Sequence, residues 1–88
     1  MIMTAGLNIS ILSYYQYMDN SQVDNFIGKK IKKIRMENNL TQEKLAVKAD
    51  VSYTTLTKIE SGVIKRPAVQ TIVKIAKALD ISIDELVK

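Results

Sequence analysis

One local pattern occurs three times in this chain and restricts it to short helices that follow one another closely. In each copy an apolar residue precedes a serine or threonine, and a leucine follows the hydroxyl residue at a fixed distance: Leu40-Thr41 with Leu45, Val51-Ser52 with Leu56, and Ile81-Ser82 with Leu86. A serine or threonine side chain caps a helix N-terminus, and the apolar residue before it packs on the fourth helical residue. In the third copy Glu85 also stands where a capping box needs it. We therefore expect helices that begin near residues 42, 53 and 83.

Two further helices follow from apolar spacing. Ile27, Ile31 and Ile34 share one helical face, and Asn38-Asn39 favours the end of that helix. Pro67 suits the first turn of the other helix. The apolar face of that helix comprises Val69, Ile72, Val73, Ala76 and Leu79. The sequence thus predicts an all-α domain of five helices, at about 24–38, 42–49, 53–61, 68–79 and 83–87.

The composition excludes several kinds of chemistry. The chain of 88 residues has neither cysteine nor histidine. Disulfides, thiolate chemistry, zinc sites and a histidine general base are therefore excluded. The acids Glu43, Asp50, Asp84 and Glu85 are scattered, and no glycine-rich phosphate loop accompanies them. We expect one small domain that is not an enzyme and that holds neither a cofactor nor a metal ion.

The positive charge lies in the middle of the chain. Residues 1–22 carry only Asp19, residues 23–66 carry 10 lysines and arginines against 5 acids, and residues 67–88 carry 3 of each. Such a basic stretch fits a surface that meets a polyphosphate, although lysines also simply solubilise small domains. No segment is apolar for long enough to cross a membrane, and the N-terminus lacks the basic residues of a secretory signal. We therefore expect a cytoplasmic protein.

The chain divides into an N-terminal extension, residues 1–22, and a domain, residues 23–88. The extension has no regular apolar period, although Tyr14, Tyr15 and Tyr17 crowd together. Because chain termini are usually held weakly, we expect a poorly structured arm. The alternative is an arm that packs against a partner.

The helices expected at 42–49 and 53–61 are separated only by Asp50-Val51-Ser52. So short a connection makes two helices cross steeply, as in a helix-turn-helix, although any small bundle can hold a tight helical hairpin. Ala46 lies where the two helices would approach most closely. The shared apolar seam would comprise Leu45, Ala49, Val51, Leu56 and Ile59. The outward face of the second helix would comprise Tyr53, Thr54, Thr55, Thr57 and Lys58. These donors and acceptors, with almost no carboxylate among them, suit a helix lying in the major groove of DNA.

Several segments together resemble a known family. They are Ile34-Arg35, Leu40-Thr41-Gln42-Glu43-Lys44-Leu45-Ala46, Val51-Ser52, Leu56, Ile59-Glu60-Ser61-Gly62, Arg66-Pro67, Ile75-Ala76-Lys77-Ala78-Leu79 and Ile81-Ser82-Ile83-Asp84-Glu85-Leu86. With them, residues 27–88 resemble the Cro/C1-type (XRE-like) helix-turn-helix domain of phage and bacterial repressors. The resemblance implies a five-helix lambda-repressor-like fold. It also implies a sequence-specific transcriptional regulator, a repressor that binds double-stranded DNA as a homodimer on a two-fold operator.

The same resemblance implies roles for individual residues. Base edges would be contacted by Tyr53, Thr54, Thr55 and Lys58. Phosphates would be held by Thr41, Gln42, Thr57, Lys65 and Arg66. Arg35 and Glu60 would form an ion pair between the first and third helices, the alternative being two solvated surface charges. The alternative for Tyr53 is packing at the start of its helix.

Two positions depart from the family pattern. Asp50 and Asp80 stand where the family usually has glycine, at the ends of the second and fourth helices. Aspartate can adopt the left-handed conformation that such positions need, at some cost in stability. At the end of the third helix we expect Gly62 to adopt it without that cost.

The C-terminal segment is where we expect two copies of the chain to meet. Residues 67–88 have no net charge, and the short helix 83–87 leaves apolar side chains without enough chain to cover them. The expected interface residues are Ile83, Leu86 and Val87. A less favoured location for this contact between copies is the tyrosine-rich N-terminal arm.

A second function is compatible with the same fold. It is an antitoxin-like or other protein-interaction module whose residues 1–22 engage a partner protein. RNA binding is less favoured, because the basic face has no aromatic platform on which bases could stack.

Overall fold

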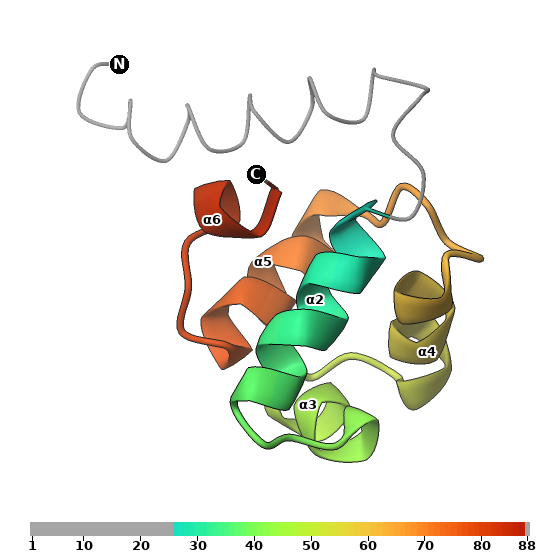
Figure 1. The fold of residues 1–88 in the computed structure, drawn as a ribbon. Helices are drawn as coiled ribbons and strands as arrows, with labels where there is room; N and C mark the ends of the chain where they lie inside the picture. The colour runs from blue at the N-terminus through green and yellow to red at the C-terminus, as the bar shows by residue number, and fades with distance from the viewer. Residues whose placement is uncertain (1–25, 88) are drawn as a thin grey trace.

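The computed structural model describes residues 26–87, which form five helices and no strand (Figure 1). The helices are α2 (Phe26–Glu37), α3 (Gln42–Ala49), α4 (Tyr53–Ser61), α5 (Val69–Ala78) and α6 (Ile83–Val87). The predicted all-α architecture is confirmed, and every expected helix boundary lies within two residues of the observed one. Within these residues, no helix has the length and apolarity needed to span a membrane. The N-terminal extension, residues 1–22, lies outside the described residues.

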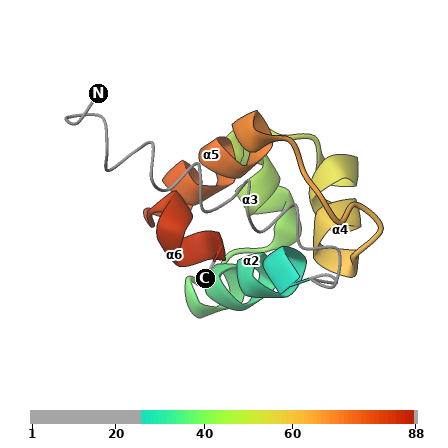
Figure 2. The same cartoon turned by 90° about the horizontal axis from the view of Figure 1, so that it is seen from above.

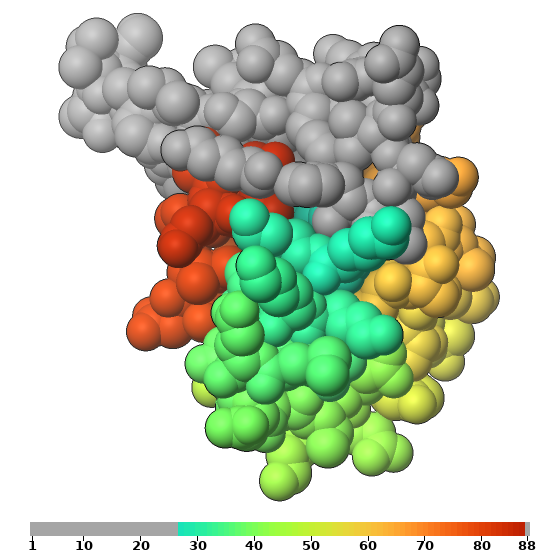
Figure 3. Space-filling model, in the orientation of Figure 1, coloured from blue at the N-terminus to red at the C-terminus, as the bar shows by residue number. Residues whose placement is uncertain are grey.

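The five helices surround a single core. α2 packs against α4 on one side and α6 on the other, while α3 packs against α4 and α5 (Figures 1 and 2). Figure 3 shows the same order on the surface, with α2 between α6 and α4. The fully buried side chains come from all five helices: Ile27, Ile31, Leu45, Leu56, Ile59, Ile72, Ile75 and Leu86. Each helix therefore contributes to the core.

The connections from α2 to α3, from α3 to α4 and from α5 to α6 end in the same three-residue motif, at residues 39–41, 50–52 and 80–82. Its first residue is left-handed, with φ of 57° at Asn39, 57° at Asp50 and 59° at Asp80. Its second residue is apolar and donates its backbone N–H to the carbonyl five residues earlier. These bonds run from Leu40 to Arg35 (3.1 Å), from Val51 to Ala46 (2.9 Å) and from Ile81 to Ala76 (3.0 Å). This bond pattern satisfies carbonyls that would otherwise be left without partners at the helix end.

The third residue of each motif caps the next helix. The capping hydroxyls of Thr41, Ser52 and Ser82 accept hydrogen bonds from the backbone N–H groups of Lys44 (3.1 Å), Thr55 (3.0 Å) and Glu85 (3.0 Å), respectively. The three predicted caps are thus confirmed. Because only three or four residues separate these helices, the chain changes direction between them within a short turn.

The segment between α4 and α5 is built differently. Gly62 ends α4 in the left-handed conformation, as predicted, with φ of 89°. We expected Pro67 in the first turn of α5, but it lies before the helix. Ala68 is extended and serves as the N-cap, without a side-chain hydrogen bond. Pro67 is buried just before this cap.

The buried face of α5 differs from the predicted one. Val69 and Val73 are only half-buried, whereas Ile75 and Ala78, which the prediction omitted, are buried. The core residues follow the spacing i, i+3, i+4 and i+7: Ile72, Ile75, Ala76 and Leu79. The helix therefore faces the core with the side that carries Ile75, and the two valines lie at the edge of the core.

The expected apolar patch on α6 is not exposed. Ile83 is 8% exposed, Leu86 0% and Val87 8%, and α6 packs against α2 and α5. The cap at Ser82 fixes the start of the helix, and the apolar face then turns inward rather than outward. The prediction that these three side chains form an uncovered dimer patch was therefore wrong.

Glycine at position 50 should stabilise the domain. The Asp50 side chain is 96% exposed and only approaches Lys74, at 3.8 Å, whereas its backbone is left-handed. Asp50→Gly should therefore raise the free energy of unfolding by about 0.5–1 kcal/mol, measured by urea denaturation. Lys48→Gly, on the exposed face of α3, is the control and should lower it by about 1 kcal/mol. A loss of stability in Asp50→Gly would contradict this account of the turn.

Candidate nucleic-acid interface

α3 and α4 form a closely packed helical pair. Only Asp50, Val51 and Ser52 separate them. Ala46 and Ala49 are both buried, and their small side chains allow α4 to lie close to α3. The predicted seam is present, except that Val51 is only partly buried.

The outer face of α4 is polar, but its residues are not equally accessible. Tyr53 is 49% exposed, and Thr54 and Lys58 are exposed as well. Thr55 and Thr57 are half-buried. The Ser52 hydroxyl donates to that of Thr55 at 2.8 Å, and the Thr57 hydroxyl donates to the Thr54 carbonyl at 2.9 Å. Of the predicted contact residues on this helix, Tyr53, Thr54 and Lys58 therefore reach furthest outward.

The loop after α4 carries two exposed cations between a partly buried residue, Ile64, and a buried one, Pro67. Lys65 and Arg66 are exposed. Before them, the N–H of Ile64 donates to the Lys58 carbonyl at 2.9 Å, and the Ile64 side chain packs on the core. After them, Pro67 is buried. The backbone that carries Lys65 and Arg66 is thus held beside the end of α4.

The N-cap and the first residue of α3 take part in hydrogen bonds within the protein. Thr41 is exposed, and its hydroxyl caps α3. Gln42 is half-buried, and its Nε2 donates to Glu60 Oε1 at 2.9 Å. This bond between α3 and α4 was not predicted, because its partners are 18 residues apart and no local pattern marks them.

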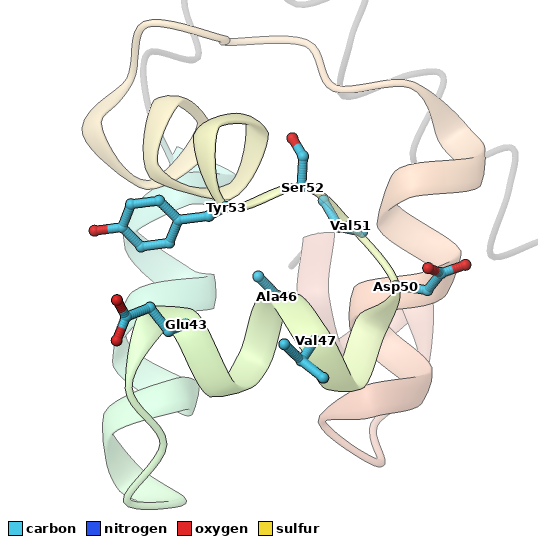
Figure 4. A pocket seen from close by; sticks show the side chains of 7 residues that line it. All are labelled: Glu43, Ala46, Val47, Asp50, Val51, Ser52 and Tyr53. Atoms are coloured by element: carbon cyan, nitrogen blue, oxygen red, sulfur yellow. The ribbon is translucent and has the colours of Figure 1, made fainter.

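A shallow groove lies between α3 and the start of α4 (Figure 4). It has a volume of about 490 Å³ and is lined by Glu43, Ala46, Val47, Asp50, Val51, Ser52 and Tyr53. Glu43 and Tyr53 stand at one end of it and Asp50 at the other. Val47 of α3, an apolar side chain in this lining, is 82% exposed. In residues 26–87 no group of three or more acids is arranged to hold a metal ion.

Arg35 and Glu60 form a buried two-point ion pair. Arg35 Nε donates to Glu60 Oε2 at 2.8 Å, and Nη2 donates to Oε1 at 3.0 Å. The two side chains are 10% and 2% exposed. Arg35 Nη1 also donates to the Leu40 carbonyl at 2.7 Å. Since Glu60 is the only acid in α4, the outer face of this helix has no carboxylate.

Removal of one partner of this ion pair should be costly. Glu60→Ala leaves a buried guanidinium without its counter-charge, so it should lower the free energy of unfolding by about 3–5 kcal/mol. Chemical denaturation of Glu60→Ala, Arg35→Ala and the double variant measures the coupling. The double variant should lose clearly less than the sum of the single losses.

The exposed pair of Lys74 with Asp50 supplies the control for this experiment. Its charges are 3.8 Å apart and face solvent, so Lys74→Ala should change stability little. Additive losses for Arg35 and Glu60 would argue against a direct energetic coupling.

Two short helices that cross at a three-residue turn, with a polar outer face on the second, define a helix-turn-helix domain. A family model described as helix-turn-helix matches residues 31–86. The chain belongs to this family, in its Cro/C1 type. It thus carries a helix-turn-helix DNA-binding domain of the kind found in transcriptional regulators.

Curated relatives and solved structures agree with this assignment. An uncharacterized HTH-type transcriptional regulator of Rickettsia conorii is 43% identical over 63 residues, which are 72% of this chain and 50% of the relative. The regulator SinR of Bacillus subtilis is 35% identical over 60 residues, which are 68% of this chain and 54% of SinR. The crystal structure of SinR in complex with DNA matches with a TM-score of 0.69 and 34% identity, over 70% of this chain and 98% of that chain. The chain spans about half the length of the curated relatives that it matches.

Proposed function

We propose that this chain binds double-stranded DNA sequence-specifically, with α4 in the major groove, and that it acts as a transcriptional repressor. The observation that carries the proposal is the outer face of α4. This face presents hydroxyls and the Lys58 ammonium, while the only carboxylate of the helix is buried against Arg35. Such a face can approach phosphates without an opposing charge. Family membership and the DNA complex of the relative SinR support the proposal.

Four residues of α4 are proposed to read bases: Tyr53, Thr54, Thr55 and Lys58. A lysine ammonium suits the guanine acceptors O6 and N7, and a threonine offers a hydroxyl to any base edge and a methyl group to thymine. Glutamine, asparagine and arginine, the strongest two-point readers, are missing from this face. We therefore expect that part of the sequence preference comes from DNA shape.

The phosphates flanking the groove are proposed to meet a second set of residues: Thr41, Gln42, Thr57, Lys65 and Arg66. Lys65 and Arg66 bring charge on a loop that is anchored at Ile64 and Pro67. The start of α3 offers backbone N–H groups, which bind phosphate well at a helix N-terminus. Contacts of this kind set the register of the protein on DNA rather than the sequence it prefers.

Two copies are proposed to bind a two-fold operator. One chain offers one recognition helix, so a second copy about 34 Å away, one helical turn along the duplex, would read the other half-site. Because Ile83, Leu86 and Val87 are buried within the chain, we do not assign the contact between copies to them.

Substitutions should separate base reading from phosphate binding. Tyr53→Ala and Lys58→Ala should each weaken binding to the preferred sequence by about 1–3 kcal/mol and leave folding unchanged. Lys65→Ala and Arg66→Ala should weaken binding to all sequences and reduce the salt slope by about 1. Titration of specific and random duplexes at several salt concentrations measures both effects.

Lys77→Ala is the matched control, since Lys77 is an exposed lysine on α5 rather than on α4 or its loop. It should leave both affinities almost unchanged. If Tyr53→Ala and Lys58→Ala fold and bind the preferred sequence as tightly as the wild type, α4 is not the recognition helix.

Selection of bound sequences from random duplex DNA should return a motif with two-fold symmetry. Its half-sites should be centred about one helical turn apart. Sedimentation of the protein with the selected duplex should give two chains per duplex. A single asymmetric half-site bound by one chain would refute the two-fold proposal while leaving DNA binding intact.

A further inference from the structure

The side-chain amide of Gln42 links the start of α3 to the end of α4. These are the two helix ends that lie away from the connecting turn. Gln42 is the first residue of α3, and Glu60 lies in the last turn of α4. Gln42 Nε2 donates to Glu60 Oε1 at 2.9 Å, and the same oxygen accepts from Arg35 Nη2 at 3.0 Å. The Glu60 side chain is 2% exposed, so the acceptor is fixed in the core.

This bond restrains α3 at the end opposite the turn. The connection Asp50–Ser52 holds the last residue of α3 to the start of α4. α3 has 8 residues and is therefore about 12 Å long at a rise of 1.5 Å per residue. A pivot of about 5° around the turn would thus displace the start of α3 by about 1 Å. A shift of that size exceeds the whole range of good N–H···O distances.

We propose that Gln42 is a positioning residue for DNA recognition: its bond to Glu60 sets the distance between the start of α3 and the base-reading face of α4. The inference rests on the function proposed above, because phosphate contacts at α3 and base contacts from α4 must form on the same duplex. Only the amide nitrogen of Gln42 can donate to the carboxylate, so Glu60 also fixes the orientation of the amide. The second hydrogen of Nε2 is then left to donate to a phosphate.

The substitution Gln42→Met tests the proposal, because methionine has a similar length and no donor. The affinity for the selected operator should fall about tenfold, the factor expected when a hydrogen bond to a charged group is lost. The affinity for random duplex DNA should fall by less than about threefold, since unspecific binding does not require α3 and α4 to be aligned. Gln70→Met, at an exposed position on α5, is the matched control and should change neither affinity.

A second measurement uses the protein without DNA. In NMR spectra of the free wild-type chain, a side-chain amide proton of Gln42 should exchange with solvent at least about tenfold more slowly than those of Gln70. Equal exchange at the two residues would overturn the inference whatever the DNA results are.

The binding results separate this inference from the proposed function. If Gln42→Met lowers the affinities for operator and random DNA by the same factor, Gln42 only contacts phosphate, and its positioning role is overturned. No loss on either DNA would overturn it as well. A wild-type chain without any sequence preference would instead refute the proposed function, and the inference with it.

Discussion

The ion pair between Arg35 and Glu60 holds together three helices that apolar contacts alone would orient less firmly. Apolar burial stabilises a core but is not directional. The guanidinium donates twice to Glu60 and once to the Leu40 carbonyl, and the carboxylate also accepts from Gln42. Burying two charges costs several kcal/mol per ion unless such bonds offset it. Here these bonds tie α2, the start of α3 and the last turn of α4 to one another.

The helix boundaries could be predicted because their causes are local. Thr41, Ser52 and Ser82 cap helices through bonds to groups only three residues away, so the sequence around each cap contains both partners. The interior could be predicted less well. Whether Ile75 or Val73 of α5 is buried, and whether α6 covers its own apolar face, depends on contacts with other helices. Such contacts join residues far apart in the sequence, and helical periodicity does not specify them.

The residues of the candidate interface also fall into those that local pattern could predict and those that it could not. Helical periodicity alone indicated that Tyr53, Thr54 and Lys58 face outward, because Leu56 and Ile59 fix the buried side of α4. The pairing of Arg35 with Glu60 was expected only from the family resemblance, since 25 residues separate them. The bond from Gln42 to Glu60 was not expected at all. Periodicity gives the side of a helix on which a residue lies, but not its partner on another helix.

The recognition helix has to satisfy two opposing electrostatic demands, and Glu60 meets both of them. A helix that faces phosphates must not expose carboxylates, yet its position must be fixed by bonds stronger than apolar contacts. A carboxylate turned inward against Arg35 provides such bonds, because hydrogen bonds between charged groups are about twice as strong as neutral ones. The same inward turn removes the only negative charge of α4 from the outer face. The anchoring of this helix and the acid-free character of its outer face therefore have one cause, the burial of a single side chain.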